Sequence, residues 1–158
     1  MIDIWDMLSS TIETRFFLGA LVAFVLIYFM SSKKTRHEIK WLIAGLSSSG
    51  VIAYISSALL KLIFQVPRIC AGQAGCPTDF SFPSEHVSVA FAMAVFLVLY
   101  KRDWRWSVVF LGMAVLLLIS RLMIGVHTIQ DVVVGVALGS FIAYVVHMNR
   151  GKILKLNL

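Results

Sequence analysis

Five long apolar segments, separated by polar connectors, constrain the fold of this chain more than any other feature. They cover about residues 16–30, 41–64, 87–100, 106–120 and 129–148. Each is near the length of helix that crosses about 30 Å of hydrocarbon, and the first and fourth are short enough to need flanking residues. Because lipid cannot hydrogen-bond to the backbone, such segments cross a bilayer as helices. The sequence therefore predicts an all-α integral membrane bundle of about five transmembrane helices.

The composition supports this class and excludes others. Hydrophobic residues make up 59% of the 158 residues, which exceeds the usual share in soluble proteins. The length suits one domain, residues 1–158. The formal net charge of +6 lies in the connectors and not along one stripe, which argues against a nucleic-acid partner. Acidic residues at 3, 6 and 13 replace the basic start of a cleavable signal peptide, so none is expected.

The first 14 residues have a pattern of their own. Ile2, Trp5, Leu8 and Ile12 recur at near-helical spacing with acidic residues between them. This pattern predicts an N-terminal interfacial amphipathic helix that lies on the membrane surface. The alternative is a frayed polar tail, since chain termini are often poorly ordered.

The basic residues predict the orientation. Ten of them follow the first, third and fifth apolar segments: Lys33, Lys34, Arg36, Lys40, Lys101, Arg102, Arg105, Arg150, Lys152 and Lys155. In a five-helix arrangement these regions share one side, which the positive-inside rule makes cytoplasmic. We therefore expect a plasma (inner) membrane protein with cytoplasmic basic loops and C-terminus. Residues 1–14, 65–86 and 121–128 would face the extracytoplasmic side.

Two places on that outer side carry groups suited to an anion. Lys61 and Arg68 are seven residues apart, so they share a helix face if the helix persists, although Pro67 suggests that it ends nearby. Ser84 precedes the third apolar segment as a capping residue. The free backbone N–H groups of a helix start favour an anion.

A third place, residues 120–131, combines a cation with a histidine and an aspartate. His127 and Asp131 are four residues apart, one turn of a helix, so the carboxylate can accept a hydrogen bond from one imidazole nitrogen. The other nitrogen would then be free to attack an electrophile. Arg121 adds a guanidinium suited to bidentate phosphate binding.

Together these groups predict phosphoryl transfer through a phosphohistidine. His127 would attack phosphorus, Asp131 would orient it, and His86 would protonate the leaving oxygen and then activate water. Three cationic side chains would neutralise the phosphate oxygens. Without a clustered carboxylate site, neither a metal nor another cofactor is expected.

These residues also carry a resemblance. The chain resembles the type 2 phosphatidic-acid phosphatase family, whose motifs are K-x6-R-P, P-S-G-H and S-R-x5-H-x3-D. The third is complete from Ser120 to Asp131, the second appears as Pro83-Ser84-Glu85-His86, and the first as Lys61 and Arg68. The resemblance covers about residues 55–148. It implies a metal-independent lipid phosphatase with His127 as nucleophile and His86 as general acid.

The chain departs from the family pattern at three points. Proline precedes Arg68 instead of following it, and about five helices replace the common six. Glu85 stands where the family has glycine. Its carboxylate either complements the dipole at the helix start or takes part in selecting the substrate. With an acidic residue at this position, the motif resembles that of the bacitracin-resistance type of undecaprenyl-diphosphate phosphatase. This resemblance implies an isoprenyl diphosphate substrate.

Several alternatives stay open from the sequence. The substrate could be a glycerolipid phosphate or lipid A phosphate, and the phosphoryl group could pass to an acceptor other than water. The chain could also have a function outside catalysis, either as a lipid-phosphate binder or as a proton-relay component of a transporter. Cys70 and Cys76 form either a disulfide or two free thiols. Gly135 and Gly139 suit a close helix contact, within the chain or between subunits, and the oligomeric state is undetermined.

Overall fold

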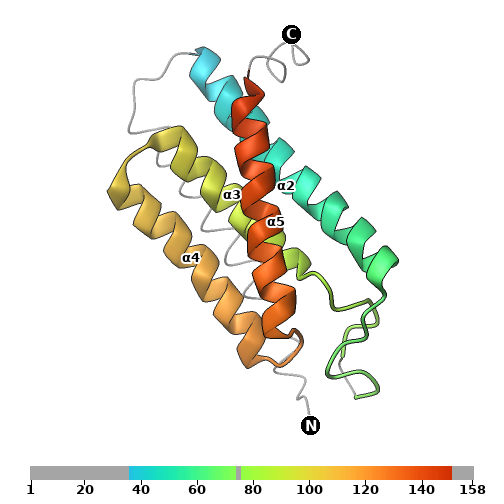
Figure 1. The fold of residues 1–158 in the computed structure, drawn as a ribbon. Helices are drawn as coiled ribbons and strands as arrows, with labels where there is room; N and C mark the ends of the chain where they lie inside the picture. The colour runs from blue at the N-terminus through green and yellow to red at the C-terminus, as the bar shows by residue number, and fades with distance from the viewer. Residues whose placement is uncertain (1–35, 74–75, 151–158) are drawn as a thin grey trace.

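The computed structural model describes residues 36–73 and 76–150, and within these residues it contains helices and no strand. The helices are α2 (Arg36–Phe64), α3 (Glu85–Lys101), α4 (Trp104–Met123) and α5 (Ile129–Met148) (Figure 1). The all-α prediction is confirmed for this part of the chain. The predicted first membrane helix and the N-terminal interfacial helix lie outside the described residues, so the count of five helices stays a prediction.

Capping residues explain where the helices change direction. Arg102 ends α3 in the left-handed conformation with φ 52°, and Asp103 then accepts a hydrogen bond from the backbone N–H of Arg105 to begin α4. The connection is therefore very short. Consecutive helices run in opposite directions, so the start of α2 and the ends of α3 and α5 lie at one end of the bundle (Figure 1).

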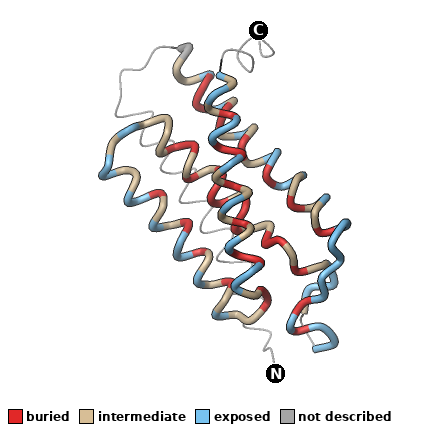
Figure 2. Tube along the Cα trace, in the orientation of Figure 1, coloured by how far each residue is buried: buried red, intermediate tan, exposed pale blue. Residues whose placement is uncertain are grey.

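Three of the described helices have the length and apolar character needed to cross a bilayer: Glu38–Phe64 within α2, then α4 and α5. Helix α3 is shorter, with 17 residues, and packs against each of the other three. Many large apolar side chains on α2, α4 and α5 are exposed, among them Leu62, Leu116 and Phe141. Exposed positions recur along the length of these helices (Figure 2). Apolar side chains on outward faces are expected where lipid replaces water around the bundle.

Small residues bring α3 and α5 close together. A Cβ built on Gly139 would lie 2.2 Å from the backbone oxygen of Ser88, and one on Gly135 would lie 3.0 Å from the backbone oxygen of Ser84. Both glycines therefore serve a helix contact within the chain, the first of the two alternatives left open by the sequence. This contact fixes the start of α3 beside the start of α5.

Candidate active site

The predicted site residues gather at one end of the helices. There α2 and α4 end, α3 and α5 begin, and the segments 65–84 and 124–128 connect them (Figure 1). Six of the eight predicted residues are buried: Lys61, Arg68, Ser84, Arg121, His127 and Asp131. Burying so many ionisable groups is costly unless they are paired or functional.

The first pair of cations does not share a helix face. Helix α2 ends at Phe64, and Gln65 turns the chain with φ 48° while its backbone N–H donates to the carbonyl of Lys61 at 2.9 Å. Arg68 therefore lies in the following loop. The two cations still meet, because both form ion pairs with the carboxylate of Asp79.

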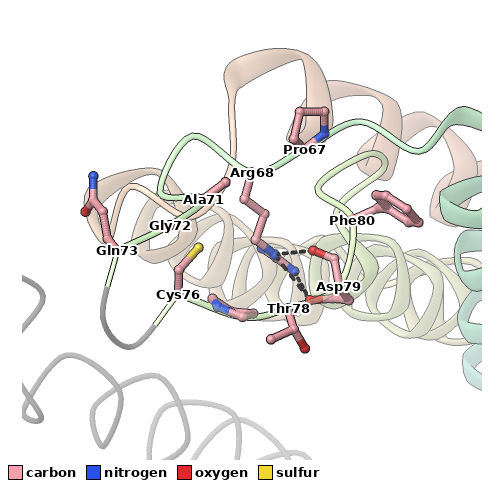
Figure 3. Close-up of a pocket in the computed structure, with 10 residues that line it drawn as sticks. Pro67, Arg68, Ala71, Gly72, Gln73, Cys76, Thr78, Asp79 and Phe80 are labelled. Carbon is pink, nitrogen blue, oxygen red and sulfur yellow. Dashed lines mark hydrogen bonds and ion pairs between the residues drawn. The ribbon is translucent and has the colours of Figure 1, made fainter.

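Arg68 connects three parts of the site. Its Nη2 donates to Oδ1 of Asp79 at 2.8 Å and its Nε to the same oxygen at 3.2 Å (Figure 3). Its Nη1 donates to the carbonyl of Val126 at 3.1 Å and lies 3.3 Å from Nε2 of His127. The guanidinium thus stands between the loop carboxylate and the predicted nucleophile.

Asp79 was not anticipated from the sequence. Its side chain is 50% exposed, whereas those of Lys61 and Arg68 are 8% and 6% exposed. Partial burial raises the pKa of Asp79, but the hydrogen bonds and positive charges of Lys61 and Arg68 outweigh burial and leave this pKa below its usual value. The carboxylate is therefore ionised at neutral pH.

His127 and Asp131 meet, but not across a helical turn as their spacing suggested. His127 precedes α5, and Thr128 is the N-cap of that helix with an extended backbone. Asp131 completes a capping box, because its Oδ2 accepts from the N–H of Thr128 at 2.7 Å and its own N–H donates to the Thr128 hydroxyl at 3.2 Å. The same Oδ2 lies 3.5 Å from Nδ1 of His127. A cap, and not a helix face, orients the pair.

Ser81 is a second residue that the sequence analysis missed. Its side chain is buried and its hydroxyl donates to Oδ2 of Asp131. The hydroxyl oxygen also lies 3.5 Å from Nδ1 of His127. The backbone N–H of Ser81 donates to the carbonyl of Val66 at 2.8 Å, which holds this serine against the segment that carries Arg68.

The two ring nitrogens of His127 therefore face different groups. Nδ1 faces the Asp131 carboxylate and the Ser81 hydroxyl, and Nε2 faces Arg68. Burial and then the positive charge of Arg68 lower the pKa of His127 to about 4, against the raising effect of Asp131. A neutral imidazole, with Nε2 next to the Arg68 guanidinium, has the form that nucleophilic attack requires.

The start of α3 supplies the second motif. The backbone N–H of Ser84 donates to the carbonyl of Asp131 at 3.0 Å, which joins the second and third motifs through their backbones. The Ser84 side chain is fully buried and makes no capping bond, contrary to the usual role of an N-cap serine. Glu85 Oε2 lies 3.8 Å from Nζ of Lys61, and His86 is partly buried in the first turn of α3.

Two further features frame the site. Arg121 lies in the last turn of α4 and not in the connecting loop where the sequence analysis placed it, because α4 continues to Met123. Cys70 and Cys76 form a disulfide, with Cα atoms 5.7 Å apart. This link closes the loop beside a cavity of about 700 Å³ that Arg68 and Asp79 help to line (Figure 3).

Among the described residues, no group of three or more histidine, cysteine, aspartate or glutamate side chains is arranged to hold a metal ion. The positive charge at the site comes from Lys61, Arg68 and Arg121. All three side chains are buried at the same end of the bundle.

The comparisons with known proteins agree on one family. Residues 41–154 match the PAP2 superfamily. An undecaprenyl-diphosphatase of Sulfolobus acidocaldarius is 41% identical over 68 residues, which are 43% of this chain and 32% of that protein. A decaprenylphosphoryl-5-phosphoribose phosphatase of Mycobacterium tuberculosis is 29% identical over 119 residues, 70% of this chain and 62% of that protein.

A solved structure is similar throughout. It is the crystal structure of a transmembrane PAP2 type phosphatidylglycerolphosphate phosphatase from Bacillus subtilis, with a TM-score of 0.63 and 25% sequence identity. The match covers 96% of this chain and 79% of the solved one. The chain therefore spans most of the solved structure, but less than two thirds of the length of each of the two curated relatives.

Proposed function

Because this chain belongs to the PAP2 superfamily, we propose that it is a metal-independent membrane lipid phosphatase that works through a phosphohistidine. The single observation that supports this mechanism best is the setting of His127. Its Nδ1 is 3.5 Å from the Asp131 carboxylate and its Nε2 is 3.3 Å from Nη1 of Arg68. One nitrogen is thus held by an acceptor, and the other lies where a phosphate would bind.

In the first step, Nε2 of His127 attacks the terminal phosphorus while the bond from phosphorus to the bridging oxygen breaks. Asp131 keeps the Nδ1 proton in place and stabilises the charge that the ring acquires. His86 donates a proton to the departing oxygen. The products of this step are phospho-His127 and the dephosphorylated lipid.

In the second step, water attacks the phosphohistidine, and His86 accepts a proton from that water. The nitrogen–phosphorus bond breaks, inorganic phosphate leaves, and His127 returns to its neutral form. Because the two steps use the same groups, no external base is needed.

The phosphate oxygens are bound by cationic side chains and backbone N–H groups. Lys61, Arg68 and Arg121 supply positive charge, which stabilises the negative charge that develops on the phosphate oxygens in the transition state. Ser84 and Glu85 contribute the N-terminal end of α3, a position that favours an anion. These residues neutralise the phosphate without a metal ion.

The substrate is a lipid with a terminal phosphate, and we favour an isoprenyl diphosphate. The names of the two curated relatives both contain a polyprenyl group, one as a diphosphate. Glu85, which replaces the glycine of the family motif, supports the same choice. The acyl or prenyl chain would enter between helices from the bilayer, and the exposed apolar faces of α2, α4 and α5 fit that environment.

The site faces the extracytoplasmic side in this proposal. The basic residues Lys101, Arg102, Arg105 and Arg150 belong to the end of the described bundle opposite to His127 (Figure 1). Under the positive-inside rule that end is cytoplasmic. Labelling Cys70 and Cys76 with an impermeant thiol reagent after reduction tests this, since labelling from the cytoplasm alone would invert the orientation.

The activity is tested by phosphate release from purified protein in detergent with EDTA. Undecaprenyl diphosphate, undecaprenyl phosphate and phosphatidic acid form the substrate panel. We expect release that His127→Ala abolishes, with an acid-labile phosphoprotein trapped in the parent protein. His37→Ala, in the first turn of α2, is the control for loss of a histidine. Release that needs added magnesium, or that survives His127→Ala, would refute the mechanism.

A further inference from the structure

The two cations of the first motif are already occupied by an anion that belongs to the chain. Asp79 forms ion pairs with Lys61 through Oδ2 and with Arg68 through Oδ1. In the proposed function, the same two side chains bind the substrate phosphate. The phosphate and the Asp79 carboxylate therefore compete for the same donors.

The geometry of the contact resembles that of a bound oxyanion. Oδ1 receives hydrogen bonds from Nη2 and Nε of Arg68, at 2.8 and 3.2 Å, and Oδ2 receives one from Lys61. Carboxylates and phosphates are bound by guanidinium groups in the same forked manner. The carboxylate oxygens thus take the place of two phosphate oxygens.

Burial indicates which partner can move. The side chains of Lys61 and Arg68 are nearly inaccessible, whereas the Asp79 side chain is half-exposed. Asp79 also lies on a loop, beside the open cavity that Pro67, Gly72 and Thr78 help to line (Figure 3). The carboxylate can leave for water while the two cations stay fixed in the site.

We propose that Asp79 sets the affinity threshold of the phosphate site, because its carboxylate holds Lys61 and Arg68 until a more highly charged anion displaces it. A terminal phosphate is largely dianionic near neutral pH and has three free oxygens. A phosphodiester carries one charge and two free oxygens, so it replaces the Asp79 contacts less well. Because each anion has to displace the same carboxylate, Asp79 lowers both affinities by one common factor. The more weakly bound diesters, such as ordinary membrane phospholipids, then fail to occupy the site, whereas a terminal phosphate still binds. This inference rests on the proposed function and deepens it.

A purely structural role for Asp79 predicts the opposite effects. If the carboxylate only positions Lys61 and Arg68, removing its charge disorders them and weakens every anion. If it competes, removing its charge frees them and strengthens the binding of every anion that has to displace it. The direction of the change separates the two roles.

The test measures binding of two small probes to the purified protein in detergent by isothermal titration calorimetry. The probes are inorganic phosphate and dimethyl phosphate, a monoanionic diester, at pH 7.5. For Asp79→Asn we expect phosphate to bind about three- to tenfold tighter, in line with the loss of partly exposed ion pairs. Dimethyl phosphate should gain by a similar factor, because both anions displace the same carboxylate.

Asp103→Asn is the matched control. It also removes one negative charge, but at the N-cap of α4, where asparagine caps equally well. It should leave both affinities unchanged. Asp79→Ser provides a second variant, and the unfolding temperature without phosphate verifies that each protein is folded.

Equal or weaker phosphate binding in both folded Asp79 variants would overturn the proposal. So would a gain in affinity that is confined to one of the two probes. The proposed function fails separately, through absence of phosphate release from lipids by the parent protein. The calorimetric comparison of variants does not depend on turnover, so the two failures are distinguishable.

Discussion

Replacing Gly139 by alanine tests whether the contact between α3 and α5 holds the site together. The added Cβ would lie 2.2 Å from the carbonyl oxygen of Ser88 and 2.9 Å from the backbone nitrogen of Ala92. These are backbone atoms of a helix, so no side chain can rotate away. To restore ordinary contact the two helices must separate by about 1 Å.

The separation has a cost in stability and in activity. Overpacking of this kind destabilises proteins by about 1–3 kcal/mol, which exceeds the roughly 1 kcal/mol that alanine gains over glycine in a helix. The start of α3 carries Ser84 and His86, and the start of α5 follows His127. A shift of about 1 Å between them is expected to lower turnover on the order of a hundredfold.

Gly112 provides the matched control. It lies within α4, and a Cβ built on it meets nothing within 4 Å. Gly112→Ala should therefore leave turnover unchanged and raise the unfolding temperature slightly. The measurements are thermal unfolding and phosphate release in the same detergent. If Gly139→Ala is as stable and as active as Gly112→Ala, the two helices are not packed as closely as the structure indicates.

Three further predictions concern the site. Ser81→Ala should lower kcat on the order of tenfold or more with little change in KM, because Asp131 loses a hydrogen bond and His127 loses a neighbouring hydroxyl. Ser81→Thr should restore part of the lost kcat, and equal kcat in all three proteins would contradict a role for the Ser81 hydroxyl in positioning Asp131 and His127. The lowered pKa of His127, about 4, keeps the ring neutral at higher pH, so on the acid side kcat/KM should fall only as pH drops toward that value, while loss of the His86 proton lowers kcat/KM on the alkaline side. Arg68→Gln should raise the pKa of His127 and move the acid-side fall to higher pH, as measured in a pH profile. Glu85→Gln should change the ratio of diphosphate to monophosphate hydrolysis, since its carboxylate is 3.8 Å from Lys61, and rates that change by one common factor would show that it has no part in selection.

The sequence by itself determined the class of the molecule and the members of the three motifs. Apolar segments of membrane-spanning length predict helices because no other open structure satisfies its backbone in lipid. Helix α5 has the predicted bounds, since Thr128 and the apolar run define its start and its length. Lys61, Arg68, His127 and Asp131 were identified from spacing, because ionisable groups between apolar runs are rare without a function.

Only the tertiary structure decided how these groups meet. Local spacing cannot show that α2 ends before Arg68, or that His127 reaches Asp131 through a helix cap. Asp79 and Ser81 carry no local signal, because polar residues are ordinary in a loop, and their roles arise from contacts with residues as many as 50 positions away. The sequence also left undecided whether Cys70 and Cys76 pair and whether Gly135 and Gly139 make their contact within the chain, because both depend on tertiary contacts. Periodicity determines a helix and its faces, whereas the partners of a loop are chosen by packing of the whole chain.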